Sequence, residues 1–376
     1  MAAGGMAPEL RLVLAGDVMT GRGIDQVLPH PVPPELHEDY VHDARTYVAL
    51  AERVNGAIPR VVEPTWPWGE AVVAMDGFGP AVRVLNLETS VTESADWARG
   101  KAVTYRMSPA NLDVVAVARA DVWALANNHV LDYGRSGLLE TLRVLAGAGL
   151  RTAGAGQNEH DAWRPAVVEC GGGRRVVVVS VGDTSSGVPP QWAAGPGRPG
   201  VALLPDLGRG TAHRVAERLL EVGRPGDLRV VSIHWGGNWG YEVPHEHRRF
   251  AHALVDAGVH VVHGHSSHHP RPIEVYRGGL VLYGCGDLVN DYEGIGGYEA
   301  YRDDLRALYL ARLDVGTAGL LGLRLVPLVV RRFRLERASL DDARWLGDTL
   351  SRAGRSVGTA LDVTEEADGP VLDLRW

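Results

Sequence analysis

The chain has 376 residues, of which 45% are hydrophobic and 22% charged, as in a globular protein of one large domain or two ordinary ones. Its formal net charge of −8 argues against a general nucleic-acid binder, and no apolar run approaches the roughly 18–20 residues that span a bilayer. Residues 1–15 lack the features of a signal peptide, and two cysteines cannot form a disulfide scaffold. We therefore expect a cytoplasmic protein without a membrane anchor.

Short runs rich in Val, Ile and Leu alternate with helical patterns, which predicts an α/β fold. The last four expected strands follow one another with little helix between them, which favours mixed rather than purely parallel sheets. Pro327 in the final strand suggests that this strand lies at a sheet edge. Strands are expected at residues 10–15, 81–87, 122–126, 175–181, 228–233, 259–263, 273–276, 280–283, 307–313 and 323–331, and helices at 44–54, 109–119, 136–146, 211–222 and 245–256.

We expect one main domain over residues 1–337, followed by a helix and a polar tail over 338–376. Two segments rich in proline or glycine, 25–79 and 184–210, interrupt the domain as long loops. Long ordered loops often shape a binding site, so both are candidate lids, although plain insertions fit the pattern equally well.

Several common catalytic motifs are absent from the sequence. The segment from His245 to Arg249 lacks the second histidine of a zincin, and Ala102 follows Lys101 where a phosphate-binding loop needs Ser or Thr. No Gly-x-Ser-x-Gly elbow occurs, so serine hydrolases and nucleotide kinases become poor explanations.

Metal-capable side chains follow five of the expected strands. In order along the chain they are Asp17, Glu88, the Asn127-Asn128-His129 run, His234, and the pair His265 and His268. Nine of the fifteen histidines lie between residues 234 and 269. Because ligands of open α/β sheets bind beyond the carboxyl ends of the strands, these groups are expected to converge on one crevice.

The sequence at these positions resembles the CapA family, the poly-γ-glutamate capsule synthesis proteins of the calcineurin-like metallophosphoesterase superfamily. The resemblance covers roughly residues 10–315 and keeps the order of the family's motifs. They are Gly16-Asp17-Val18-Met19-Thr20-Gly21-Arg22, Asn86-Leu87-Glu88-Thr89, Ala126-Asn127-Asn128-His129-Val130-Leu131-Asp132-Tyr133-Gly134, Gly264-His265-Ser266-Ser267-His268, Pro272-Ile273-Glu274-Val275-Tyr276 and Leu282-Tyr283-Gly284-Cys285-Gly286-Asp287.

The resemblance implies two mixed sheets packed face to face and flanked by helices, with a centre for one or two divalent metals at the strand ends. Asp17 would bind a first metal and Glu88 would lie between two. Asn128, His234 and His265 would bind the second metal, and His268 the first. Carboxylate, amide and imidazole ligands suit Mn, Fe or Zn better than Ca.

Three further residues receive catalytic roles in this interpretation. His129 would protonate the leaving group or stabilise the transition state, and Asp132 could fix its tautomer. Arg22 could hold a phosphate or carboxylate as a fork, or could simply be a surface arginine near a turn.

Two positions depart from the expected pattern. Met19 stands where the wider superfamily has a histidine, so a single-metal site is an alternative. Asp287 could add a carboxylate to the site or cap the following turn, and of these we favour the cap. Cys285 is expected to be a small buried residue rather than a nucleophile.

These features favour a metal-dependent hydrolase in which a metal-activated hydroxide attacks a phosphate ester or an amide. The substrate would be a small molecule or an anionic polymer such as polyglutamate. Alternatives are a non-catalytic accessory or binding protein of polyglutamate synthesis, and an enzyme that ligates or cyclises an amide bond.

Overall fold

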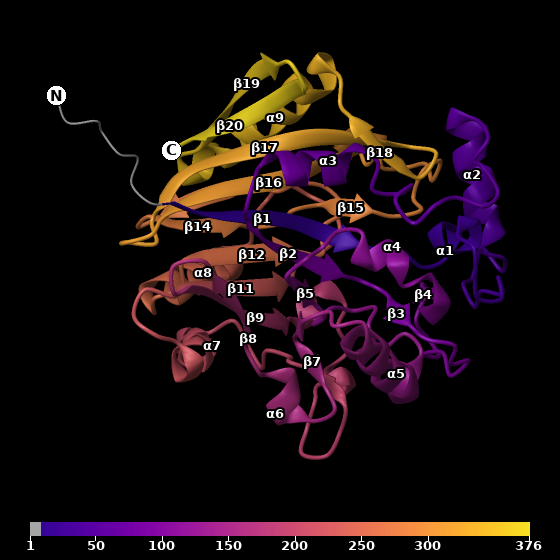
Figure 1. The fold of residues 1–376 in the computed structure, drawn as a ribbon, viewed down its shortest axis with the longest axis horizontal. Helices are drawn as coiled ribbons and strands as arrows, with labels where there is room; N and C mark the ends of the chain where they lie inside the picture. The colour runs from indigo at the N-terminus through magenta and orange to yellow at the C-terminus, as the bar shows by residue number, and fades with distance from the viewer. Residues whose placement is uncertain (1–8) are drawn as a thin grey trace.

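A computed structural model describes residues 9–376, so the first eight residues of the 1–15 segment lie outside the described part. Two large sheets pack against each other across a shared apolar cluster, with helices on their outer faces and the C-terminal elements at one end (Figure 1). The expected α/β fold of two mixed, packed sheets is therefore confirmed.

The first sheet has ten strands, with the order β19-β20-β17-β16-β1-β2-β5-β6, while β15 pairs with β1 and β18 with β17. Strands β1, β2, β5, β6 and β15 run parallel to their neighbours in this group, and the others are antiparallel. The bounds are β1 Glu9–Val18, β2 Val82–Leu87, β5 Val122–Ala124, β6 Thr152–Ala153, β15 Asp287–Val289, β16 Leu305–Asp314, β17 Leu320–Arg331, β18 Arg334–Arg337, β19 Ala360–Glu366 and β20 Gly369–Arg375.

The second sheet has six strands, ordered β13-β14-β12-β11-β9-β8, with a parallel centre and one antiparallel strand at each edge. Its bounds are β8 Ala166–Cys170, β9 Arg174–Gly182, β11 Leu228–His234, β12 Val261–His265, β13 Ile273–Tyr276 and β14 Gly279–Leu282. Two short pairs complete the strands: β3 Ser90–Val91 with β4 Arg106–Met107, and β7 Ala155–Gly156 with β10 Gly200–Val201.

The helices are α1 Gly23–Val27, α2 Arg45–Asn55, α3 Glu70–Gly77, α4 Asp113–Ala116, α5 Gly134–Gly147, α6 Glu159–Ala162, α7 Arg209–Val222, α8 His245–Asp256 and α9 Leu340–Gly354. Short 3-10 turns lie at Pro109–Asn111, Thr184–Ser186, Pro190–Trp192, Glu299–Tyr301 and Arg355–Val357.

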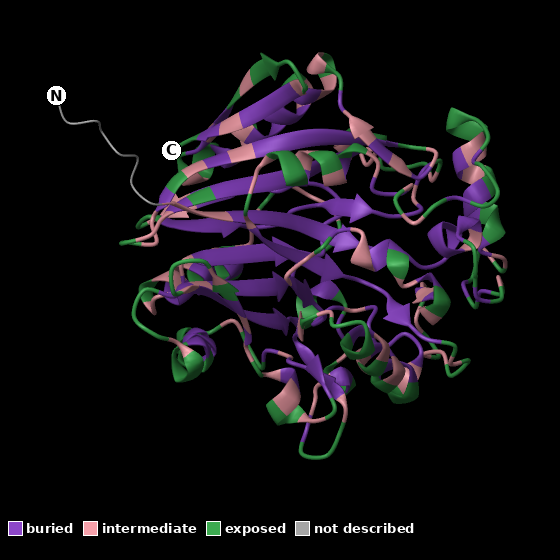
Figure 2. Ribbon diagram, viewed as in Figure 1, coloured by how far each residue is buried: buried purple, intermediate pink, exposed green. Residues whose placement is uncertain are grey.

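Three apolar clusters explain why these elements stack in layers. One lies between the sheets, where Leu14 of β1 and Val230 of β11 are both buried, and α9 contributes Leu346 to it. The second joins the first sheet to α2, α3 and α5, and the third joins the second sheet to α7 and α8. Because most strands are covered on both faces, they are buried along much of their length (Figure 2).

Three sequence-based expectations are wrong in detail. Strand β17 is interior, and Pro327 is tolerated because its position lies between the stretch that pairs with β20 and the stretch that pairs with β18. The segment after α9 is not a polar tail, since β19 and β20 form a hairpin that extends the first sheet. The helix expected over 109–119 is a 3-10 turn, capped by the Ser108 side chain, followed by the short α4.

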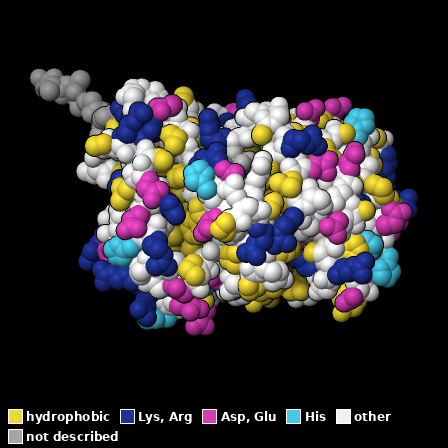
Figure 3. Space-filling model, turned by 90° about the horizontal axis from the view of Figure 1, so that it is seen from below, with side chains coloured by type: hydrophobic (Ala, Val, Ile, Leu, Met, Phe, Trp, Pro, Cys, Tyr) yellow, Lys and Arg dark blue, Asp and Glu magenta, His cyan; other side chains and the backbone are white. Residues whose placement is uncertain are grey.

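The described residues contain no helix that is long and apolar enough to cross a membrane. Acidic and basic side chains are intermingled on the face shown in Figure 3. Cys170 and Cys285 are both free, and burial raises the pKa of the Cys285 thiol well above its usual value, as befits a packed residue rather than a nucleophile.

Candidate metal centre

The strand-end groups meet where the carboxyl ends of the two sheets come together. Asp17 lies near the end of β1, Glu88 follows β2, His234 ends β11 and His265 ends β12. The structure brings these side chains together with Asn128 and His268, as the strand-end argument expects. Their roles as metal ligands stay predictions.

Asp17 is held by hydrogen bonds to three neighbouring segments. Its backbone N–H donates to the Gly286 carbonyl at 3.1 Å, and a Cβ at Gly16 would lie 1.7 Å from that same oxygen, so only glycine allows this approach. Asn86 Nδ2 donates to one carboxylate oxygen at 2.8 Å, and the Ser266 amide donates to the other at 3.1 Å. Ser266 has a positive φ of 100°, a strained turn that directs its amide to Asp17.

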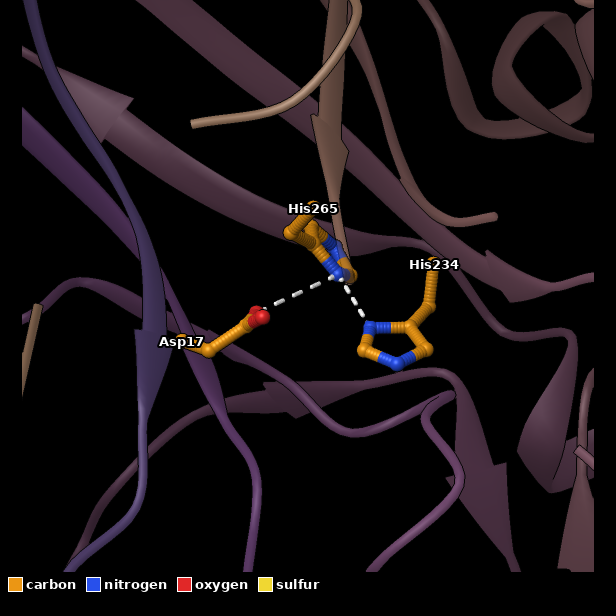
Figure 4. A group of neighbouring side chains, drawn as sticks. All are labelled: Asp17, His234 and His265. Carbon is orange, nitrogen blue, oxygen red and sulfur yellow. Dashed lines mark hydrogen bonds and ion pairs between the residues drawn. The ribbon is translucent and has the colours of Figure 1, made fainter. Parts of the chain in front are cut away.

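His234 and His265 are cross-strand neighbours in the parallel register of β11 and β12. Their Nδ1 atoms lie 2.7 Å apart, and His265 Nδ1 lies 3.9 Å from Asp17 (Figure 4). His234 Nε2 lies 2.9 Å from Asn128 Oδ1 and 3.8 Å from Glu88. The ligand atoms of Asp17, His234 and His265 all lie within 4.8 Å of one another, a spacing suited to one bound ion.

A chain of hydrogen bonds fixes which nitrogen of His265 carries the proton. The Ala15 carbonyl can only accept, so His263 Nε2, 2.8 Å away, must donate to it. Burial lowers the pKa of His263 to about 4, so its Nδ1 is a bare acceptor for the Ser232 hydroxyl at 3.1 Å. Ser232 Oγ then accepts from His265 Nε2 at 2.9 Å, which leaves His265 Nδ1 unprotonated and facing Asp17.

His268 forms a second group with Asp17 and Asp287, whose ligand atoms also lie within 4.8 Å of one another. His268 Nδ1 lies 2.9 Å from Asp287 Oδ1, while Asn290 donates to the other carboxylate oxygen at 2.6 Å. Asp287 accepts no backbone hydrogen bond among the described residues, so the favoured capping interpretation of Asp287 is wrong. Asn290 instead accepts from the Tyr292 amide in the following turn.

The carboxylates of this cluster lack an ion pair with lysine or arginine, although the charge of Lys101 partly offsets the rise in the pKa of Glu88. Within residues 9–376, neither residue type pairs with Asp17, Glu88 or Asp287, although all three are buried. Burial, reinforced by Asp287, raises the pKa of Asp17 to about 7, and burial with Asp17 raises that of Glu88 well above its usual value. Buried carboxylates without a cation are costly, so this donor set fits a divalent metal.

Burial and neighbouring imidazoles lower the pKa values of His234 and His265 well below the usual range, so both are neutral, as ligands must be. Burial also opposes protonation of His268, but Asp287 and Asp17 outweigh this effect and raise its pKa. The two carboxylates of this half of the cluster therefore stabilise the protonated, positively charged form of His268.

His129 lies beside this centre, with its Nε2 3.7 Å from Glu88. Its Nδ1 lies 2.5 Å from Asp132 Oδ2, the geometry expected if Asp132 fixes the tautomer. Asn127 holds the backbone of this turn, since its Oδ1 accepts from the His129 and Val130 amides at 3.1 and 3.0 Å.

Lys101 is a member of this group that sequence reasoning did not identify. Its Nζ donates to Asp132 and to the Asn128 carbonyl, and lies 2.9 Å from His129 Nδ1. Burial, Lys101 and other charges lower the pKa of His129 to about 4 despite the opposing effect of Asp132. The one available signal was that Lys101 is the only lysine in the chain.

Arg22 differs from both expectations, because it is neither at the surface nor free to bind a substrate anion. Its guanidinium forks onto Asp291 at 2.5 and 3.1 Å and also donates to Glu38 at 2.9 Å. It lies 3.9 Å from the ring centroid of Tyr47 and 4.4 Å from that of Tyr105. Arg22 thus connects the 25–79 segment to the loop after β15 through buried ion pairs.

The chain is similar to several known proteins. The "Probable polyglutamine synthesis accessory protein Rv0574c" of Mycobacterium tuberculosis is 52% identical over 348 residues, which are 92% of each chain. The "PGA biosynthesis protein CapA" of Bacillus subtilis is 28% identical over 208 residues, covering 55% of this chain and 52% of its own. A solved structure described as a novel phosphatase of Mycoplasma pneumoniae aligns over 86% of this chain and 95% of its own, with 12% identity and a TM-score of 0.45.

The sequence model of the family described as "Bacterial capsule synthesis protein PGA_cap" matches residues 11–292. This match spans the motifs from Asp17 to Asp287, the whole second sheet, and strands β1 (from residue 11), β2, β5, β6 and β15 of the first sheet. The chain belongs to the bacterial capsule synthesis protein PGA_cap family.

Proposed function

We propose that this protein is a metal-dependent hydrolase of the metallophosphoesterase type, acting on a phosphate ester or on an amide of a polyglutamate-like or small-metabolite substrate. The observation that carries the proposal is the convergence of buried carboxylates and imidazoles from both sheets, beside the half-buried Asn128 amide and without an ion pair between these carboxylates and a lysine or arginine of residues 9–376. A structural role alone would not require so many buried polar groups at one point.

In this proposal Asp17 and His268 would hold one metal and Asn128, His234 and His265 the other, with Glu88 available to both. A divalent metal in such a centre lowers the pKa of a water and polarises a phosphoryl or carbonyl oxygen. The relay through Ser232 supports this assignment, since it presents the bare Nδ1 of His265 to the centre.

His129 supplies the proton chemistry of the proposed reaction. Because Asp132 holds Nδ1, the free nitrogen of the neutral ring is Nε2, which faces Glu88 and the centre. Nε2 can accept a proton from water during attack and return it to the leaving oxygen or nitrogen, so one group acts as base and then as acid. Asp132, which also accepts from Lys101, holds the ring for both steps.

The test is hydrolysis of a phosphomonoester, a phosphodiester and a γ-glutamyl oligomer, each with Mn²⁺, Fe²⁺ or Zn²⁺. We expect turnover of at least one substrate that is lost in His265→Ala and kept in Glu274→Gln. The control residue is also a buried carboxylate paired with a histidine, at 3.0 Å from His252, but it lies outside the centre. Full activity of His265→Ala would contradict the proposal.

The names of the relatives favour one other candidate, a non-catalytic accessory or binding protein of polyglutamate synthesis. This alternative predicts tight binding of a poly-γ-glutamate chain by the metal-loaded protein, with no turnover of any of the three substrates. The same preparation therefore distinguishes the two candidates.

A further inference from the structure

We propose that Asp287 is a metal ligand that completes the half of the centre formed by Asp17 and His268, in place of the histidine that Met19 replaces. This inference rests on the metal centre of the proposed function and adds a residue to it. With Asp287 as a ligand, this half of the centre should prefer a hard ion such as Mn²⁺.

The backbone places Asp287 beside Asp17. Strand β15 runs parallel to β1, and Asp17 and Asp287 are direct partners in the register. The ligand atoms of these two carboxylates and of His268 lie within 4.8 Å of one another, and all three residues are buried. Two buried carboxylates side by side repel each other unless a cation lies between them.

Apart from His268, the surroundings hold Asp287 in place without a direct cation. Asn290 Nδ2 donates to Oδ2 at 2.6 Å, and Arg306 Nη2 donates to Asn290 Oδ1 at 2.9 Å, so the arginine reaches Asp287 only through an amide. Ligating carboxylates are commonly oriented by hydrogen bonds of this kind. The arrangement keeps the negative charge available at the centre.

The two halves of the centre then differ in chemistry. The half with Asp17, Asp287 and His268 offers two carboxylates and one imidazole, whereas the other half offers His234 and His265 with the Asn128 amide. Carboxylate-rich sites suit Mn²⁺, while imidazoles suit Zn and Fe as well. The carboxylate-rich half should therefore take Mn²⁺ readily.

A competing explanation is that Asp287 only orients His268 through the 2.9 Å contact with Nδ1. The two roles predict different losses of metal affinity. Removing a group that only orients a ligand lowers metal affinity by about 10–100-fold. Losing a charged ligand from a half-site with few protein donors should exceed that range.

The experiment titrates chelator-stripped protein with Mn²⁺ alone and measures free Mn²⁺ by its electron paramagnetic resonance signal. We expect wild type to bind about two ions, Asp287→Ala to lose affinity at one site by more than 100-fold, and His268→Ala to lose the same site. Glu274→Gln, which alters a buried carboxylate–histidine pair elsewhere, should keep both sites. A loss of 100-fold or less in Asp287→Ala overturns the proposal.

Folding is monitored by urea unfolding of the metal-free proteins, where Asp287→Ala should still unfold in one cooperative transition, although His268 and Asn290 each lose a partner. If Asp287→Ala does not fold, Asp287→Asn decides, since its oxygen can still accept from His268. A tenfold or greater loss at one site then supports ligation, and a smaller loss overturns it.

Failure of this inference is distinguishable from failure of the proposed function. Unchanged binding by Asp287→Ala beside a wild type that binds Mn²⁺ overturns only the role of Asp287. A wild type that binds Zn²⁺ or Fe²⁺ but no Mn²⁺ overturns the inference alone, and a wild type that binds none of the three ions overturns the metal centre as well.

Discussion

Replacing Ser232 with alanine tests the hydrogen-bond relay behind the candidate metal centre. The serine hydroxyl joins His263 Nδ1, at 3.1 Å, to His265 Nε2, at 2.9 Å, in a fully buried position. Without it, nothing fixes the proton of His265 on Nε2. The ring can then place the proton on Nδ1, the nitrogen that faces Asp17.

Two effects of Ser232→Ala can be estimated. Each of the two ring nitrogens left without a partner costs about 1–3 kcal/mol, so the free energy of unfolding of metal-free protein should fall by about 2–6 kcal/mol. Metal affinity should fall by about 10–100-fold, as for other groups that orient a ligating histidine, which corresponds to about 1.4–2.8 kcal/mol.

Calorimetric titration with Zn²⁺ or Mn²⁺ measures the affinity, and urea unfolding measures the stability. Ser180→Ala is a matched control, because Ser180 is the register partner of Ser232 on β9 and is equally buried, yet it accepts only from the Ala126 amide. It should lose stability but keep metal affinity. Metal affinity of Ser232→Ala within about threefold of wild type would refute the relay.

Three other variants test neighbouring parts of the account. Arg22→Met should lower the free energy of unfolding by about 3–5 kcal/mol, because it leaves Asp291 and Glu38 buried without their cation; a loss below about 1 kcal/mol in urea unfolding would contradict this role. Lys101→Met removes a charge that lowers the pKa of His129, so NMR titration of metal-free protein should show that pKa rising by roughly one unit from about 4, and no rise would refute the interaction. Burial lowers the pKa of His247, which stacks on Trp235, to about 4; unfolded protein therefore binds more protons, and stability should fall as pH drops from about 6.5 towards 4. His247→Phe should reduce that fall by on the order of 2 kcal/mol in urea unfolding at several pH values, and an unchanged pH profile would count against it.

The sequence predicted the parallel strands well, because strands buried on both faces are continuous apolar runs such as the one that forms β9. The polar residue after each run then located the centre. The hairpin of β19 and β20 was missed because β19 is exposed along much of its length. Its polar residues, such as Glu365 and Glu366, are typical of an unstructured C-terminal tail. Pro327 led to the wrong prediction of an edge strand. Strand β17 is interior, but its pairing on the side of β18 and β20 is interrupted at Pro327.

Arg22, Lys101 and Asp287 were harder to assign from the sequence. Their partners are distant in the chain, or their residue type more often has another structural role. Arg22 pairs with Asp291, 269 positions away, and no local pattern indicates that contact. Lys101 reaches Asp132 from a loop without periodicity. Aspartate is a frequent turn cap, so Asp287 could be assigned only once its register partner, Asp17, was known.

The most direct test of the central claim is the metal content of protein purified without chelator, measured by elemental analysis for wild type and His265→Ala. The account predicts about two equivalents of Mn, Fe or Zn per wild-type chain. It also predicts a clear loss in His265→Ala, since that residue presents a bare nitrogen to the centre. A wild-type protein that holds no metal, even after reconstitution with each ion, would contradict the account.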